Sequence, residues 1–199
     1  MKKLYVLLFI SVITFSVTKG QFTRFGGGLG YSTGFPFHNM PWDANKSGHL
    51  NISLKGLYQL KMPIQISPSF TFLFPHITKE TQYGEEITTT VSTFMFDING
   101  HYVFNSLDRF EFYGLAGLDI LLAGKKEVYE MSGSTTTTNK EKDNALGLNL
   151  GVGTYMKITE QIDLYGEVKY IVSKYDQFIV NAGVLINLDW LTKNENAGK

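Results

Sequence analysis

The chain has 199 residues and a mass of 22.4 kDa, which fits one domain. Charged residues make up only 18% of it, and the 18 basic residues balance the 18 acidic ones. We therefore expect no basic field for nucleic acid. Because the sequence contains no cysteine, disulfide frameworks, thiol chemistry and a lipoprotein anchor are also excluded. The low charge, against about 25% in soluble domains, favours a membrane setting.

The first residues have the features of a secretory signal. Lys2 and Lys3 form a positive start, Leu4 to Val17 are mostly apolar, and Thr18 to Gly20 offer a cleavage site. The apolar run is shorter than the roughly 20 residues that a spanning helix needs. We predict a signal peptide over residues 1–20. No later apolar run reaches spanning length, so an integral mature protein must be a β-barrel.

The mature chain shows a period of two that is typical of strands. Eight segments alternate in this way: Phe22–Gly34, Gly48–Leu60, Pro63–Phe74, Thr90–Phe104, Phe110–Ala123, Ala145–Ile158, Ile162–Ser173 and Gln177–Trp190. Short connections alternate with long polar ones. We expect long loops at Phe35–Ser47, Pro75–Thr89 and Gly124–Asn144, and a tight one at Lys174–Asp176. The run Thr135–Thr138 predicts a mobile, low-complexity stretch.

The two faces of these strands differ in polarity. One face is a continuous apolar row without charge. The other carries the polar residues Arg24, Lys55, Asp97, Asn99, His101, Glu111, Asp119, Asn149, Lys157, Asp163, Glu167 and Lys169. A soluble carrier barrel would have the opposite polarity, so this pattern predicts lipid outside and polar groups inside.

An eight-stranded barrel has an interior just wide enough for side chains to fill. Buried charges are tolerated only when they are paired and hydrogen-bonded. The polar face therefore predicts an ion-pair and hydrogen-bond network that fills the lumen. His101 shares this face with Asp97 and Asn99, but side chains two apart on a strand do not converge on a metal, so we expect a hydrogen-bonding role for it.

The last strand carries a further pattern, a polar residue, a glycine and two spaced hydrophobic residues: Asn181, Gly183, Ile186 and Leu188. With the signal and the strand meander, it resembles the small outer-membrane β-barrel domain family, akin to OmpX, the membrane domain of OmpA and PorT-like "porin family" proteins. The resemblance implies an all-β, eight-stranded antiparallel up-and-down transmembrane barrel over residues 21–190, in the outer membrane. It also implies that the barrel-assembly machinery reads the last strand. Residues 191–199 depart from the family pattern, since many such barrels stop on a terminal aromatic residue, and we expect them to form a periplasmic tail.

For function we expect a structural or surface scaffold that needs no cofactor, metal or catalytic site. Its partners would be outer-membrane lipid and lipopolysaccharide, together with a protein bound at the long loops. Three alternatives remain open: a narrow porin-like channel, a lipid A-modifying enzyme and a soluble lipocalin-like carrier. An enzyme would draw on rim residues, and the candidates are His38, His49, His76, Ser47, Ser69, Asp43, Glu80, Glu85 and Glu86. Their spacing matches no catalytic motif.

Overall fold

The computed structural model describes residues 22–34, 48–82, 85–131 and 134–188. The predicted signal peptide, the Phe35–Ser47 loop and the C-terminal tail lie outside these residues. No helix in the described part of the chain is long and apolar enough to cross a membrane.

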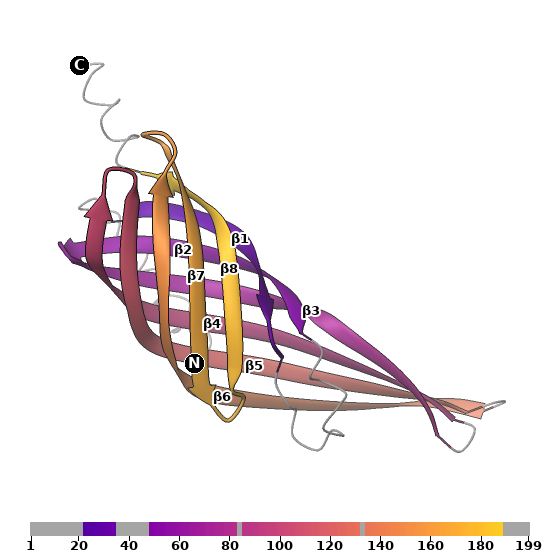
Figure 1. Ribbon diagram of the computed structural model, residues 1–199. Helices are drawn as coiled ribbons and strands as arrows, with labels where there is room; N and C mark the ends of the chain where they lie inside the picture. Colours follow the sequence, from indigo (N-terminus) through magenta and orange to yellow (C-terminus); the bar gives the residue numbers. More distant parts are fainter. Residues whose placement is uncertain (1–21, 35–47, 83–84, 132–133, 189–199) are drawn as a thin grey trace, which may run out of the picture.

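The chain forms a closed barrel of eight antiparallel strands in sequence order, as the alternation predicts (Figure 1). The strands are β1 (Phe22–Ser32), β2 (His49–Lys61), β3 (Ile64–Gln82), β4 (Glu85–Leu107), β5 (Phe110–Met131), β6 (Ser134–Lys157), β7 (Ile162–Ser173) and β8 (Gln177–Asn187). The ring closes where β1 pairs with β8 over nine residue pairs, from Arg24 opposite Asn187 to Ser32 opposite Ile179.

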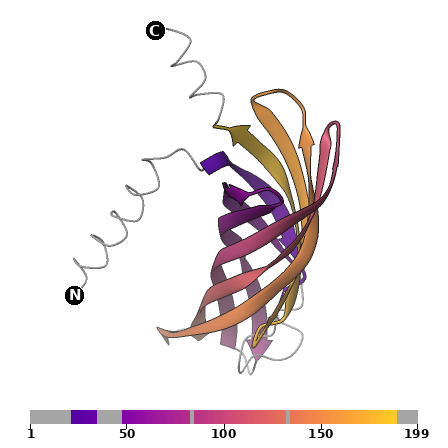
Figure 2. The same cartoon turned by 90° about the vertical axis from the view of Figure 1, so that its left-hand side faces the viewer.

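The two ends of the barrel differ in the length of their connections. Met62–Pro63, Asp108–Arg109 and residues 158–161 make three tight turns at one end, which we call the short-turn rim. The β3–β4 and β5–β6 hairpins, together with the β7–β8 turn at Lys174–Asp176, lie at the other end, the hairpin rim. Figure 2 shows the β4–β5 and β6–β7 turns at one end and the β5–β6 hairpin running past the wall at the other.

The predicted long loops at Pro75–Thr89 and Gly124–Asn144 are wrong, because both segments are mostly strand. β3 pairs with β4 out to Gln82 opposite Glu85, and the expected mobile run is paired, with Val128 opposite Thr138. Both segments are rich in threonine, which favours strands. The polarity that suggested loops belongs to a sheet that continues past the rest of the barrel: Figure 1 shows both hairpins extending well beyond the other strands.

The outward face is the apolar row that the sequence predicts. Exposed side chains of this belt include Leu54, Phe70, Phe96, Leu118, Leu150, Tyr170 and Val184. None of them is charged. In water such a surface would be unstable, since soluble proteins rarely expose apolar patches of more than a few hundred Å². The belt therefore identifies the wall of the barrel as the lipid-facing surface.

Barrel closure can be tested at the β1–β8 pairing. Leu29 and Ala182 lie directly opposite each other and point outward. Paired Cα atoms in antiparallel strands are about 4.5–5.5 Å apart, within the roughly 4.4–6.8 Å that a disulfide spans. We expect the Leu29→Cys/Ala182→Cys double variant to cross-link on oxidation, against a background free of native cysteine.

The control is Leu29→Cys/Phe178→Cys, whose second cysteine lies four residues away along β8, at about 13 Å. It should remain uncrosslinked on a non-reducing gel. An open sheet would leave both pairs uncrosslinked, and a shifted register would favour the control.

Candidate functional site

The inner face of β4 changes character along its length. Met95 comes first, then Asp97, Asn99 and His101, and then Val103, and all five side chains are buried. A polar stretch thus lies at mid-height in the lumen, with apolar residues on either side of it.

The neighbouring strands continue this layering. Towards the hairpin rim the lumen is filled by Leu73, Val91, Met95, Leu121, Ala123, Ala145, Ile171, Tyr175 and Ile179. Towards the short-turn rim it is filled by Leu57, Val103, Tyr113, Leu115, Tyr155, Tyr165 and Leu185. Sequence reasoning missed these two apolar layers because it treated the inner face as uniformly polar. They separate the buried charges from water at both ends.

Lys169 and Asp97 form the first ion pair of this polar layer. The Lys169 Nζ donates to Asp97 Oδ2 at 2.7 Å, and both side chains are almost wholly buried. Asp97 also accepts from the Ser69 hydroxyl at 3.0 Å and from the Asn149 amide at 2.7 Å. That amide reaches Asn99 Oδ1 at 2.8 Å. Three donors from three other strands therefore converge on one carboxylate.

Lys55 and Glu167 form the second pair. Their ammonium and carboxylate are in direct contact, and the Tyr113 hydroxyl donates to the same carboxylate at 2.9 Å. The Lys55 ammonium also lies 4.7 Å from the centre of the Tyr165 ring, within the range of a cation–π contact. His101 Nε2 is 3.9 Å from Glu167. This pair ties β2 to β7 across the lumen.

An aromatic stack supports the pair on the side of the short-turn rim. The rings of His101, Tyr113 and Tyr155 stack in order with 4.4 Å between successive centroids, and the Tyr155 hydroxyl lies 2.7 Å from His101 Nδ1. The prediction omitted both tyrosines, although each lies two residues from a predicted lumen position, Glu111 or Lys157. Strict alternation would have found them.

Glycines on the inner face make room for this stack. A methyl group added to Gly153 would collide with the Tyr113 hydroxyl. A small residue opposite a large one lets both fit inside a narrow barrel. The glycine therefore lets a full tyrosine ring lie across the lumen.

Asp119 stands apart from the paired charges. It lies directly opposite Asp97 in the β4–β5 register and is fully buried. Neither of its oxygens accepts a hydrogen bond from any described residue. The layer holds the carboxyls of Asp97, Asp119 and Glu167 against the ammonium groups of Lys55 and Lys169. One carboxyl of this layer therefore has no cation of its own.

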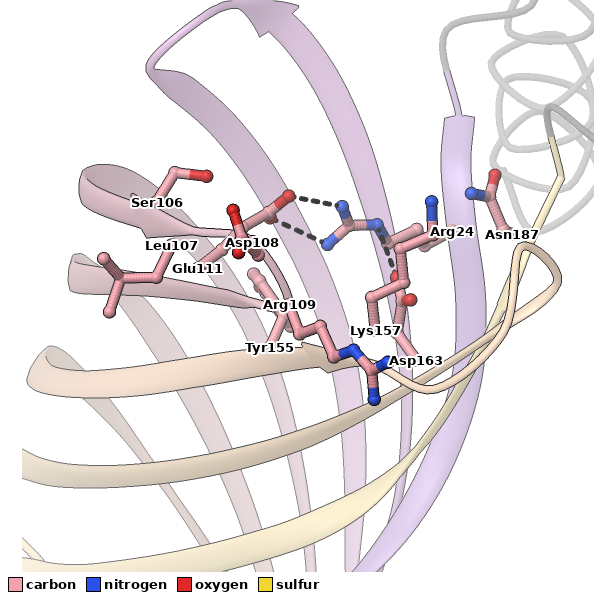
Figure 3. Close-up of a pocket in the computed structure, with 10 residues that line it drawn as sticks. All are labelled: Arg24, Ser106, Leu107, Asp108, Arg109, Glu111, Tyr155, Lys157, Asp163 and Asn187. Carbon is pink, nitrogen blue, oxygen red and sulfur yellow. Dashed lines mark hydrogen bonds and ion pairs between the residues drawn. The ribbon is translucent and has the colours of Figure 1, made fainter.

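A third cluster closes the lumen at the short-turn rim (Figure 3). The guanidinium of Arg24 makes two hydrogen bonds of 3.0 Å to Glu111 and contacts Asp163 at 3.0 Å. It also lies 5.1 Å from the Tyr155 ring centre. These groups line a cavity of about 140 Å³. Lys157 also lines the cavity, opposite Asp163, and its side chain is exposed because it ends β6 at the rim.

The hairpin rim has ion pairs on its inner face. Lys125 contacts Glu127 at 2.8 Å and Glu141 at 3.5 Å. Lys174 of the β7–β8 turn donates to Asp143 of β6, and with the Tyr175 hydroxyl it lowers the pKa of that carboxyl to about 2. These contacts fasten the base of the long β5–β6 hairpin to the barrel.

The candidate enzyme residues whose side chains the structure describes, His49, Ser69 and Glu86, do not come together as a catalytic group. Ser69 pairs with Lys55 of β2, which is six residues from His49. His49 and Ser69 are therefore separated by about 20 Å along the strand direction. His49 is within 3.3 Å of the Phe74 carbonyl, whereas Ser69 donates to Asp97. Glu86 pairs with Lys79. His38, Asp43 and Ser47, and the side chains of His76, Glu80 and Glu85, lie outside the described part.

Within the described residues, no three histidine, aspartate or glutamate side chains come together as a metal site.

The last-strand pattern lies at the seam of the barrel. Asn181 points inward opposite Gly30, and Ile186 is exposed on the outside opposite Phe25. Gly183 faces Gly28 across the seam, and the Leu188 backbone amide donates to the Thr23 carbonyl at 2.8 Å. Asn181, Gly183 and Ile186 thus lie on β8, the strand that closes the ring, and Leu188 directly follows it. Their role as an assembly signal stays a prediction.

Comparison with known proteins agrees with this architecture. Residues 5–190 match the model of the outer membrane protein beta-barrel domain family. No curated protein sequence matches the chain.

Among solved structures, a major outer membrane protein from Thermus thermophilus is similar, with a TM-score of 0.53, 11% identity, and coverage of 82% of this chain and 98% of that one. OprG from Pseudomonas aeruginosa has a TM-score of 0.52 at 10% identity, with coverage of 83% and 96%. The N-terminal β-barrel domain of Pseudomonas aeruginosa OprF has a TM-score of 0.50 at 15% identity, with coverage of 85% and 99%. At these identities the likeness concerns the fold alone.

Replacing Lys55 tests the ion pair with Glu167. We expect Lys55→Met to destabilise the barrel by about 3–5 kcal/mol, because a buried carboxylate would lose its counter-ion. Urea unfolding in lipid vesicles measures the change. Lys61→Met is the matched control, since Lys61 is exposed at the short-turn rim. A Lys55→Met midpoint equal to that of wild type would contradict the network.

The neighbouring carboxyls should respond in opposite directions. Asp97→Asn leaves Lys169 without its anion, so we expect a loss of about 3–5 kcal/mol. Asp119→Asn removes a carboxyl that has no cation and supplies an amide that can donate to Asp97. We expect it to be at least as stable as wild type in the same unfolding experiment. Equal destabilisation by both substitutions would show that Asp119 has a stabilising partner.

Proposed function

Because the chain belongs to the outer membrane protein beta-barrel domain family, we propose that it is a closed-lumen scaffold of the outer membrane that acts through its protruding hairpins. Membership of the family implies an outer-membrane location. By the asymmetry common to such barrels, the short turns face the periplasm and the hairpin rim faces outward.

The filled lumen is the observation that favours a scaffold over a narrow channel. Lys55, Glu167, Lys169 and Asp97 are at most 4% exposed, and an apolar layer lies on each side of them. An ion in transit would have to break both buried pairs and cross both apolar layers. Each broken pair would leave an uncompensated charge away from water, which is costly. This cost supports a structural core rather than a pore.

The protruding sheet supports a role in surface interaction. Beyond Leu73 the edge of β3 has no partner in β2, and before Gly147 the edge of β6 has none in β7. Strands with free edges can pair with an added strand. We take lipopolysaccharide, or a protein at these hairpins, as the partner. The surrounding lipid and the barrel-assembly machinery, acting on β8, complete the proposed partners.

Other functions receive less support. A lipid A-modifying enzyme would need a histidine and a nucleophile close together, whereas His49 and Ser69 lie at different heights and bond to other groups. A soluble carrier would need a polar outside and an apolar cup, the reverse of what the strands carry. We therefore propose a non-enzymatic protein without a cofactor.

Single-channel recording tests the closed lumen. We expect the purified protein in planar bilayers to give no stepwise conductance, because paired side chains fill the barrel. The same preparation must first show heat modifiability on a gel, so that silence reflects a folded barrel. Reproducible steps from folded protein would instead identify a channel.

A further inference from the structure

Three lysines cluster on the outward face of the protruding sheet. Lys126 of β5 lies directly opposite Lys140 of β6, and Lys142 lies opposite Gly124, one outward position nearer the barrel. All three lysines are exposed, on the same face as the lipid-facing Leu122. Like charges directly opposite each other on a sheet are destabilising. An anion bound from outside the chain would offset this repulsion.

The chain itself supplies no such anion in its described part. Lys126, Lys140 and Lys142 form no ion pair there, and the β4 residue opposite Lys126 is Thr90. In the described side chains of the protruding parts of β5 and β6, the acids Glu127, Glu141 and Asp143 alternate to the inner face and pair with Lys125 and Lys174. These two strands thus pair the described charges of their inner face and leave the three outward lysines without an ion pair among the described residues.

A groove adjoins the lysines on the same face. It has a volume of about 530 Å³ and is lined by Phe94, Leu122, Gly124, Lys142 and Asn144, and also by Ser92, Ala123 and Asp143, whose carboxylate is paired with Lys174. A Cβ added at Gly124 would meet nothing within 4 Å, so the groove is open at that point. Phe94 and Leu122 belong to the apolar belt, so the groove continues the lipid-facing surface up to an ammonium group.

The height of the lysines matches a lipid headgroup. Lys126 lies four residues beyond Leu122, and Lys142, opposite Gly124, lies two residues beyond the level of Leu122. Four residues of strand span about 13 Å and two span about 7 Å, or about 10 and 5 Å along the membrane normal at the tilt of roughly 40° typical of such barrels. The ammonium groups therefore lie just outside the hydrocarbon, where the phosphates of the outer leaflet are found.

We infer that this surface is a binding site for the phosphorylated glucosamine headgroup of lipid A, with one acyl chain in the groove. The inference rests on the proposed outer-membrane function and on its orientation. Lysine is a compact point charge suited to phosphate. The opposed Lys126 and Lys140, with Lys142 beside the groove, provide contacts for the charged headgroup and its chain together.

Binding of lipid A to the purified protein in neutral detergent tests this site, with native mass spectrometry as the readout. We expect the triple variant Lys126→Gln/Lys140→Gln/Lys142→Gln to bind at least tenfold more weakly than wild type. In Gly124→Leu the new side chain would extend into the open space of the groove, so we expect this variant to bind lipid A several-fold more weakly. Lipid A stripped of both phosphates should bind weakly to all variants.

The controls distinguish binding at this site from non-specific electrostatic attraction between any exposed lysine and the phosphates of lipid A. Lys61→Gln, at the short-turn rim, should bind as wild type does, and Lys142→Gln alone should bind more weakly than Lys61→Gln. The inference is overturned if wild type fails to bind, if the triple variant binds equally well, or if Lys61→Gln loses as much as Lys142→Gln. Equal binding of phosphatidylglycerol would also overturn it.

All the substituted side chains are exposed or fill open space, so we expect each variant to fold. Heat modifiability on a gel checks this. A folded, non-conducting protein that does not select lipid A would refute the site and leave the scaffold proposal standing. A conducting protein would refute the closed lumen, whatever its affinity for lipid A.

Discussion

The structure depends on neutralising charge where water cannot reach. Lys55 with Glu167 and Lys169 with Asp97 lie between two apolar layers that fill the lumen above and below them. In such surroundings an unpaired charge is costly, while a paired one fixes geometry. Each pair joins strands far apart in sequence, so it specifies which strands face each other across the barrel. The same closed core is what supports the proposed scaffold over a channel.

The charges at the hairpin rim are in a different environment, because water reaches them on one side. The inner face of the protruding sheet neutralises itself through Lys125 with Glu127 and through Asp143 with Lys174. The outer face holds three lysines that have no ion pair among the described residues, beside an apolar groove. Alternation along β5 and β6 thus places the paired charges inward and the three lysines outward. This asymmetry turns a structural extension into a candidate surface for a ligand.

Much of the fold could be predicted from alternation, because a period of two assigns each residue to one face. Asp97, Lys55 and Lys169 were placed in the lumen for this reason. Alternation says nothing about position along the barrel axis, so the apolar layers around Met95 and Leu57 were missed. The same limit explains the error at Gly124–Asn144. A polar stretch can be a loop or a strand in water, and only its pairing with β5 distinguishes them.

The sequence by itself determined the closed all-β architecture, the lipid-facing wall and the set of polar side chains inside, because these follow from local alternation and from the need to satisfy backbone hydrogen bonds in lipid. The tertiary structure alone decided which charges meet. The partners Lys55 and Glu167 are 112 residues apart, and Lys169 and Asp97 are 72 apart. Such contacts depend on strand register and tilt, which no local pattern encodes. Strand register likewise places Asp119 beside Asp97 and brings three lysines together at the hairpin rim.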